Sequence, residues 1–296
     1  PGGQGHFGAV TQQAKASDIG RAACPGHLGR VGRTTVELEH GERCRVQVGR
    51  LNGRLAAQAL DMLVEHVLPG VTTEALDELI MEFAQQHDAI PATLNYRGYT
   101  KAICTSVNHV VCHGIPGPKA LREGDIVNID VTLIVNGWHG DTSRMFAVGA
   151  VPRKAERLID VTYEAMQRGI AAVKPGHTTG HIGAAIQKFA EAERCSVVRE
   201  FCGHGLGRHF HERPNILHYG VEGDGVVLKP GMIFTIEPMI NLGRASVTVS
   251  PDGRTAVTRA RQLPAQFEHS VGVTEEGCEV FTLSPKGYHC PPYAAG

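Results

Sequence analysis

Between residues 51 and 86 the apolar positions recur with helical spacing in two consecutive segments. In the first, Leu60, Leu63, Val64 and Val67 share one face, and the Pro-Gly pair at 69–70 ends the helix. In the second, apolar residues stand at positions 76, 79, 80 and 83, and Thr72 or Thr73 is placed to cap the helix. The pattern therefore predicts two successive helices, each packed by one apolar face.

The same arrangement returns 106 residues later, where Pro175-Gly176 repeats Pro69-Gly70. The apolar positions after the second pair match those after the first. The strand-like run 124–130 (GDIVNID) also aligns with 231–237 (GMIFTIE), so Asp130 falls on Glu237. We infer two half-repeats, at about 51–150 and 155–285, each ordered helix, helix, strands. Two copies at so long a period indicate a pseudo-two-fold molecule with a site between its halves, not a solenoid.

Residues 1–48 show neither helical nor strand periodicity, and glycine is dense among them. They predict a poorly patterned N-terminal arm ahead of one domain at 49–290. A short strand at residues 34–38 (TTVEL) is compatible with the local composition.

Five acidic or histidine side chains interrupt runs that otherwise suit buried strands or glycine-rich turns. Asp130 lies within 126–135 (IVNIDVTLIV), Glu237 within 232–239 (MIFTIEPM), and Glu268 within 266–271 (QFEHSV). An unpaired buried charge costs several kcal/mol or loses its ionisation, and clustered carboxylates repel unless a cation lies between them. Taken singly, each acid could be an ordinary strand-edge residue facing water. Taken together, the set suits two divalent ions that share bridging oxygens: Asp130, Asp141, His204, Glu237 and Glu268.

The Asn136-Gly137 pair between two strand-like runs predicts a tight hairpin. A two-residue turn there pairs Val135 with Trp138 and Thr132 with Asp141. Asp130 then points to the same face as Asp141, roughly 7–8 Å away diagonally across the strands. Both carboxylates could therefore reach one dinuclear centre.

Composition narrows the function classes. The chain has 296 residues and a formal net charge of -1, so no strong attraction to nucleic acid or membrane is implied. No apolar run approaches a membrane span, and no secretory signal pattern is seen. None of the eight cysteines forms a C-x-x-C pair, so a thiolate zinc site is not expected. Their apolar surroundings favour reduced thiols and a cytoplasmic location.

Seven segments together closely resemble the type I methionine aminopeptidases, which are pita-bread metallopeptidases. They are residues 111–116 (VCHGIP), 128–132 (NIDVT), 139–143 (HGDTS), 202–205 (CGHG), 210–212 (FHE), 234–239 (FTIEPM) and 267–269 (FEH). The resemblance extends from about residue 51 to 286. It implies an α+β pita-bread fold: a pseudo-two-fold duplication with a curved antiparallel sheet, covered by helices, and a dinuclear metal site between the halves.

The resemblance also implies roles for individual residues. Asp141 and Glu268 would bridge two divalent ions, Asp130 would complete one shell, and His204 with Glu237 the other. Catalysis would involve His113, His211 and Glu237. The substrate would meet His113, His211 and a methionine pocket formed by Tyr96, Tyr99, Cys104 and Phe210.

The implied reaction is removal of the initiator methionine from nascent polypeptides, with preference for a small second residue. A hydroxide bridging the metals would attack the scissile carbonyl. The implied cofactors are two ions of Co, Mn, Fe or Zn, with a monovalent cation as a further candidate. We expect nascent polypeptide N-termini as partners, transient ribosome contact, no specific nucleic acid, no membrane, and a monomer.

Three departures from the family pattern stand out. Residues 1–50 match poorly, Arg254 replaces a tryptophan common near the pocket mouth, and Ala260 and Pro264 replace polar residues. Two alternatives remain open: a metal-free pita-bread module that binds protein or RNA, and a dipeptidase or Xaa-Pro peptidase. A metal-free module would have lost metal ligands, whereas all five ligand positions are intact in this sequence. Type II enzymes insert a subdomain between the positions of His204 and Glu237, where only 32 residues lie here.

Overall fold

The computed structural model describes residues 35–259 and 261–293. Contacts divide the chain into residues 1–41 and 42–296, and every site discussed below lies in the second unit. Within the described residues, none of the helices is long and apolar enough to cross a membrane. The strand expected at 34–38 is wrong, because helix α1 spans Thr35–Leu63. The expected arm thus overlaps a helix from Thr35 onward, and residues 1–34 lie outside the described residues.

Two helical pairs appear where the repeat predicts them. Helix α1 is followed by α2 (Thr73–Gln86), and α3 (Arg153–Ala171) by α4 (Thr179–Ala192). Thr72 caps α2, since its Oγ1 accepts a hydrogen bond from the Ala75 amide at 3.1 Å. Thr178 caps α4 in a capping box with His181. The second Pro-Gly turn therefore leads into a capped helix as the first does.

Within the part of the chain that the structure describes, the strands form four sheets, and all their pairings are antiparallel. In the first half β4 and β5 form a long hairpin beside β1 and β2. In the second half the largest sheet has the order β15-β14-β9-β7-β8. Two smaller sheets are β13-β10-β6 and β11-β12-β3. The bounds are β1 Ile90–Pro91, β2 Cys104–Val107, β3 Val110–Cys112, β4 Ile126–Val135, β5 Trp138–Ala147, β6 Ser196–Val197, β7 Gly203–Gly205, β8 Glu212–Ile216, β9 Ile233–Ile236, β10 Met239–Asn241, β11 Val247–Val249, β12 Ala256–Thr258, β13 Pro264–Gln266, β14 His269–Val273 and β15 Cys278–Val280, with a 3-10 turn at Tyr96–Gly98.

The β4–β5 hairpin has the predicted register. Val135 pairs with Trp138 and Thr132 with Asp141. The turn residues Asn136 and Gly137 have φ values of 53° and 76°. Positive φ at both central positions is the geometry of a type I′ turn, which asparagine and glycine tolerate at low cost.

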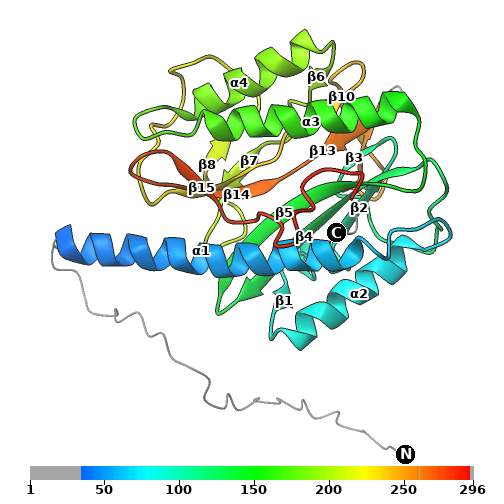
Figure 1. Cartoon of the computed structure of the whole chain (residues 1–296), viewed down its shortest axis with the longest axis horizontal. Coiled ribbons are helices and arrows are strands. Elements are labelled where there is room, and N and C mark those ends of the chain that lie inside the picture. The colour runs from blue at the N-terminus through cyan, green and yellow to red at the C-terminus, as the bar shows by residue number, and fades with distance from the viewer. Residues whose placement is uncertain (1–34, 260, 294–296) are drawn as a thin grey trace, which may run out of the picture. The chain divides into compact units, whose positions relative to one another are not determined.

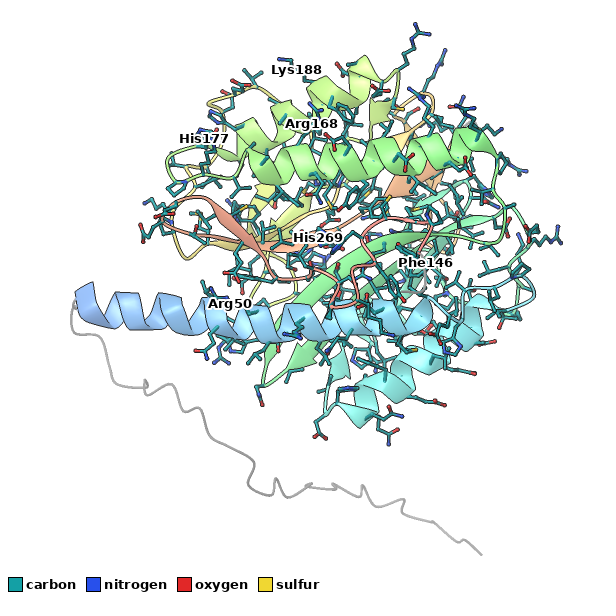
Figure 2. The ribbon with its side chains drawn as sticks, in the orientation of Figure 1. Arg50, Phe146, Arg168, His177, Lys188 and His269 are labelled. Carbon is teal, nitrogen blue, oxygen red and sulfur yellow. The ribbon has the colours of Figure 1, made fainter. Side chains whose placement is uncertain are left out.

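Each helical pair covers one apolar cluster. Helices α3 and α4 pack on β9, β13 and β14, whereas the later part of α1 and α2 pack on β4. Figure 1 shows the strands between these two helical pairs. Phe146 and His269 are buried among the strands, while Lys188 lies on the outer helix α4 (Figure 2). The antiparallel sheets between helices and the repeated element order confirm the predicted fold class.

Candidate metal centre

Two of the predicted ligands come from the β4–β5 hairpin. Asp130 pairs with Ser143, and Asp141 pairs with Thr132, so both acids project from the same face as expected. Asp141 is buried. Asp130 Oδ1 is also buried, and no hydrogen-bond partner for it exists among the described residues.

The other three come from the five-stranded sheet of the second half. His204 lies in β7, Glu237 directly follows β9, and Glu268 directly precedes β14. Because His269 pairs with Ile236, the antiparallel register places Glu268 opposite Glu237. All three side chains are buried.

A bridge between strands of the two halves brings the two sets together. The Glu268 amide donates to the Ser143 carbonyl at 3.0 Å, and the Ser143 amide donates back at 3.4 Å. Thr142 Oγ1 adds a hydrogen bond to the Glu268 carbonyl at 2.8 Å. The hairpin acids therefore meet the acids of the second half across this seam, as the repeat predicts.

The ligand atoms lie at spacings that suit a shared cation. His204 Nε2 is 3.6 Å from Asp141 Oδ2 and 3.6 Å from Glu237 Oε1. One ligand atom each from Asp141, His204 and Glu268 lies within 4.8 Å of the others. Nitrogen and oxygen atoms bound at ~2.0–2.2 Å to one ion are themselves about 3–4 Å apart. The spacing is thus open enough to admit an ion.

Burial and mutual repulsion dominate the electrostatics of the four carboxylates. Burial raises the pKa of Asp141 to about 7, although hydrogen bonds from Thr132 and the Thr142 backbone oppose the shift. Burial, followed by the neighbouring acids, raises the pKa of Asp130, Glu237 and Glu268 well above their usual ranges. Within the described residues, none of the four acids forms an ion pair with lysine or arginine. A divalent cation would supply the missing charge.

His204 is suited to bind a metal ion as a neutral imidazole. Burial lowers the pKa of His204 to about 4. Its Nδ1 donates to the Gly205 carbonyl at 3.1 Å, which leaves the lone pair of Nε2 facing the acids. Four carboxylates and one neutral imidazole, with one buried carboxylate oxygen unpaired, fit the divalent ions that the sequence leads us to expect.

Supporting residues around the acids were missed at the sequence level. Thr132 Oγ1 donates to Asp141 Oδ1 at 2.6 Å, and Thr235 Oγ1 donates to Glu237 Oε1 at 2.8 Å. Gln266 Nε2 donates to the other oxygen of Glu237 at 3.4 Å. Each stands two residues from a ligand along extended backbone, so strand-like alternation could have identified them. The buried His218, whose Nε2 accepts from the Glu237 amide at 3.1 Å, gave no such signal.

An aromatic cluster adjoins His204. The ring of His211 lies 4.3 Å from that of His204 and 4.3 Å from that of Phe210. Tyr96 contacts both Phe210 and His211, and its hydroxyl is 2.9 Å from His211 Nδ1. Desolvation, then the positive charge of neighbouring groups, lowers the pKa of His211 to about 3, although part of its surface is exposed. The structure thus gathers three of the predicted substrate residues beside the acids.

The remaining predicted substrate residues have differing contacts. Cys104 is buried on β2, paired with Asp130. Tyr99 is buried, and its hydroxyl bonds to the carbonyls of Ile103 and Gly114. His113 is exposed and packs edge-on against Phe201, and desolvation with nearby Arg254 lowers its pKa.

Arg254 and Pro264 mark two of the sequence departures. Arg254 donates to the Arg97 carbonyl and lies 6.0 Å from the Tyr99 ring centroid. Pro264 begins β13, where it pairs with Asn241. Ala260, which was grouped with Pro264, lies outside the described residues.

Comparison with known proteins gives the family. Residues 50–275 match the model of metallopeptidase family M24. Methionine aminopeptidase of Rickettsia prowazekii (strain Madrid E) is 57% identical over 245 residues, covering 82% of this chain and 95% of the relative. Methionine aminopeptidase of Escherichia coli (strain K12) is 53% identical over 237 residues, covering 79% and 89%. The crystal structure of methionine aminopeptidase from Rickettsia prowazekii matches with a TM-score of 0.81 and 55% identity, covering 81% of this chain and 98% of that one. The chain therefore belongs to metallopeptidase family M24, in the pita-bread group formed by the methionine aminopeptidases.

Proposed function

We propose that this chain is a metallo-aminopeptidase that removes N-terminal methionine from nascent polypeptides, with the five clustered residues holding two divalent ions. The observation that carries the proposal is the cluster of Asp141, Glu237 and Glu268 around the neutral imidazole of His204, in a chain more than half identical to methionine aminopeptidases. Asp130, whose Oδ1 is buried and unpaired, projects from the same hairpin face as Asp141. Asp141 and Glu268 would bridge the ions, with Asp130 on one ion and His204 and Glu237 on the other. We favour Co, Mn, Fe or Zn as the metal, and a monovalent cation remains part of the proposal.

When bound, such ions would acidify a water and polarise the scissile carbonyl. The protein's own residues orient the peptide and move protons. Glu237, whose pKa is raised by burial and by Asp141, is placed to accept a proton and pass it to the leaving amine. Thr235 donates to Oε1 of Glu237 and fixes its orientation.

His211 is suited to bind the carbonyl oxygen of the substrate. At neutral pH its ring is uncharged. If the Tyr96 hydroxyl donates to Nδ1, Nε2 carries the ring proton and can donate to the oxygen as charge develops there. His113, which is exposed, would contact the peptide next to the scissile bond.

The methionine side chain would lie among Tyr96, Tyr99, Cys104 and Phe210. Thioether sulfur packs favourably against aromatic ring edges, which the contact between Tyr96 and Phe210 provides. A preference for a small second residue is part of the proposal. A monomeric, cytoplasmic enzyme with transient ribosome contact completes the proposal, and the buried free thiols of Cys104, Cys112 and Cys195 favour a reducing compartment.

The test is release of methionine from Met-Ala-Ser by metal-stripped protein after separate addition of Mn²⁺, Co²⁺, Fe²⁺ or Zn²⁺. Release with at least one ion, with Met-Ala cleaved faster than an Xaa-Pro bond, is the expected result. Bound metal with faster Xaa-Pro cleavage would indicate the Xaa-Pro peptidase instead. Failure to bind any ion would favour the metal-free binding module.

A further inference from the structure

A basic pocket lies on the β11-β12-β3 sheet, apart from the acidic cluster. It has a volume of about 630 Å³. Its lining residues are polar or positively charged except for one valine: His109, Thr248, Ser250, Val257, Thr258, Arg259 and Arg261. Thr248, Arg259 and Arg261 are exposed, so the pocket opens to solvent. Acidic residues are absent from this lining.

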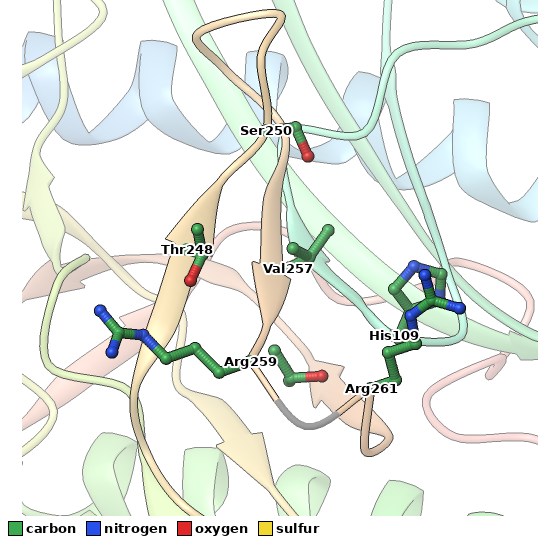
Figure 3. Close-up of a pocket in the computed structure, with 7 residues that line it drawn as sticks. His109, Thr248, Ser250, Val257, Arg259 and Arg261 are labelled. Atoms are coloured by element: carbon green, nitrogen blue, oxygen red, sulfur yellow. The ribbon is translucent and has the colours of Figure 1, made fainter.

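The positive groups stand at the two ends of the pocket. Figure 3 shows Arg261 together with His109 on one side, whereas Arg259 extends toward Thr248 on the other. Arg259 Nε donates to the Val247 carbonyl at 3.4 Å. Burial, followed by the charges of Arg261 and Lys119, lowers the pKa of His109. Among the described residues, neither arginine forms an ion pair with an acid.

This arrangement suits an extended anion better than a single small one. A lone phosphate is bound tightly where several donors converge on one point. Here the guanidinium groups diverge. The side chains of Thr248, Ser250 and Thr258, which carry hydroxyls, also line the pocket. A chain with two or three negative groups spaced along it would meet both ends.

The pocket is connected to the active site by one strand. His109 precedes β3 and His113 follows it, so the catalytic histidine and the pocket flank the same three residues. At ~3.3 Å per residue they are at most roughly 13 Å apart along the strand. Strand β12 runs alongside, pairing Ala256 with Cys112 and Val257 with Val110. An extended peptide covers this distance with about four residues.

We propose that the basic pocket is an exosite that binds acidic side chains of the polypeptide substrate, about four to six residues after the methionine. The proposal rests on the proposed aminopeptidase function and deepens it by naming a substrate class. Peptides with aspartate or glutamate at these positions would bind more tightly and be processed at lower concentration. The scissile bond itself would be cleaved as in any other substrate.

The experiment compares three peptides with the metal-loaded enzyme at low ionic strength. They are Met-Ala-Ser, which is too short to reach the pocket, Met-Ala-Ser-Gly-Asp-Glu-Asp-Gly, and its neutral analogue Met-Ala-Ser-Gly-Asn-Gln-Asn-Gly. We expect kcat/KM to be about fivefold higher for the acidic octapeptide than for the neutral one, mainly through KM. The ratio should approach one in 0.5 M salt.

The variant R259Q/R261Q should abolish this preference and leave turnover of Met-Ala-Ser unchanged. The matched control is R153Q/K154Q, which removes two exposed positive charges from the start of α3 and should keep the preference. Equal loss in both variants would assign the effect to net charge and overturn the proposal.

The three peptides distinguish an error in the proposed function from an error in the exosite alone. If Met-Ala-Ser is not cleaved, the proposed function is wrong. If it is cleaved while wild-type enzyme treats the two octapeptides alike, only the exosite is wrong. Binding of a ten-nucleotide RNA that R259Q/R261Q loses, without any peptide preference, would assign the pocket to nucleic acid instead.

Discussion

Two groups of buried charge in this molecule contrast with each other. Asp61 on α1 is buried with Arg144 of β5, and their Oδ1 and Nη1 atoms are 2.5 Å apart. Ser284 Oγ and the Lys286 amide also donate to Asp61. At the candidate metal centre, four carboxylates lie together with no such partner among the described residues, and one oxygen of Asp130 has no hydrogen bond.

The two groups show two ways in which buried charge can be neutralised in a folded chain. At Asp61 the counter-charge is part of the chain, so the pair is complete once the protein folds. At the cluster, threonines and a glutamine hold the acids in place but supply no positive charge. Such a site is complete only with a cation from solution. Stability should therefore depend on metal at one region and not at the other.

Removing Glu268 should give the largest effect. Glu268→Ala deletes a proposed bridging ligand, so we expect methionine release to fall by at least roughly a thousandfold, together with loss of bound metal. In the metal-free state the variant should be no less stable than wild type, because one of several mutually repelling acids is gone. Glu156→Ala, at an exposed position of α3, is the control. Retained activity with a full metal complement would contradict the bridging role.

Removing Asp61 should act on stability instead. Asp61→Ala leaves Arg144 buried without its partner, which typically costs about 3–5 kcal/mol. Urea denaturation of metal-saturated protein measures this loss. The double variant D61L/R144M should recover part of it, because no unpaired charge remains. A loss below about 1 kcal/mol would mean that water or a neighbouring group replaces Asp61.

Removing His211 should separate catalysis from metal binding. His211→Ala deletes the proposed donor to the substrate oxygen, for which we expect kcat to fall by about a hundredfold. Metal content, measured by atomic emission, should remain close to that of wild type. If the metal is lost as well, His211 acts on the structure of the centre.

The smallest effect concerns pH. Burial raises the folded-state pKa of Asp141 to about 7, so its contribution to stability is fully present below its ordinary pKa and is lost as pH rises through 7. His204, lowered to about 4, acts in the opposite sense, but only below its ordinary value near 6.5. Above pH 6.5 only the clustered acids still change the stability of the metal-free protein with pH. Metal-free protein should therefore lose about 1–2 kcal/mol between pH 6.5 and 8. Saturating metal should remove this loss, and a metal-free stability that rises over the same range would contradict the sign.

Much of the fold and the cluster could be predicted because the deciding signals are local. The Asn136-Gly137 turn sets the β4–β5 register by itself, and Thr72 caps α2 within four residues of sequence. The duplication then relates Asp130 to Glu237 without any structure. In these elements the local residue preferences and the long-range strand pairing favour the same structure.

The remainder depends on contacts between distant segments. The sequence predicts a strand and an arm where α1 begins, because β-branched and glycine residues there disfavour a helix. Further along the same helix the folded chain gives the reason for one glycine: a Cβ at Gly53 would lie 2.8 Å from Phe281. His218 and the basic pocket likewise arise only when remote strands meet, and neither has a pattern along the sequence.

Whether divalent cations complete the acidic cluster can be measured by calorimetric titration of metal-stripped protein with Mn²⁺ at pH 7.5. We predict two ions bound per chain with release of protons, and a raised melting temperature in wild type and in Arg259→Gln but not in Glu268→Ala. Absence of binding, or equal binding in Glu268→Ala, would show that the acidic cluster is not the proposed metal centre.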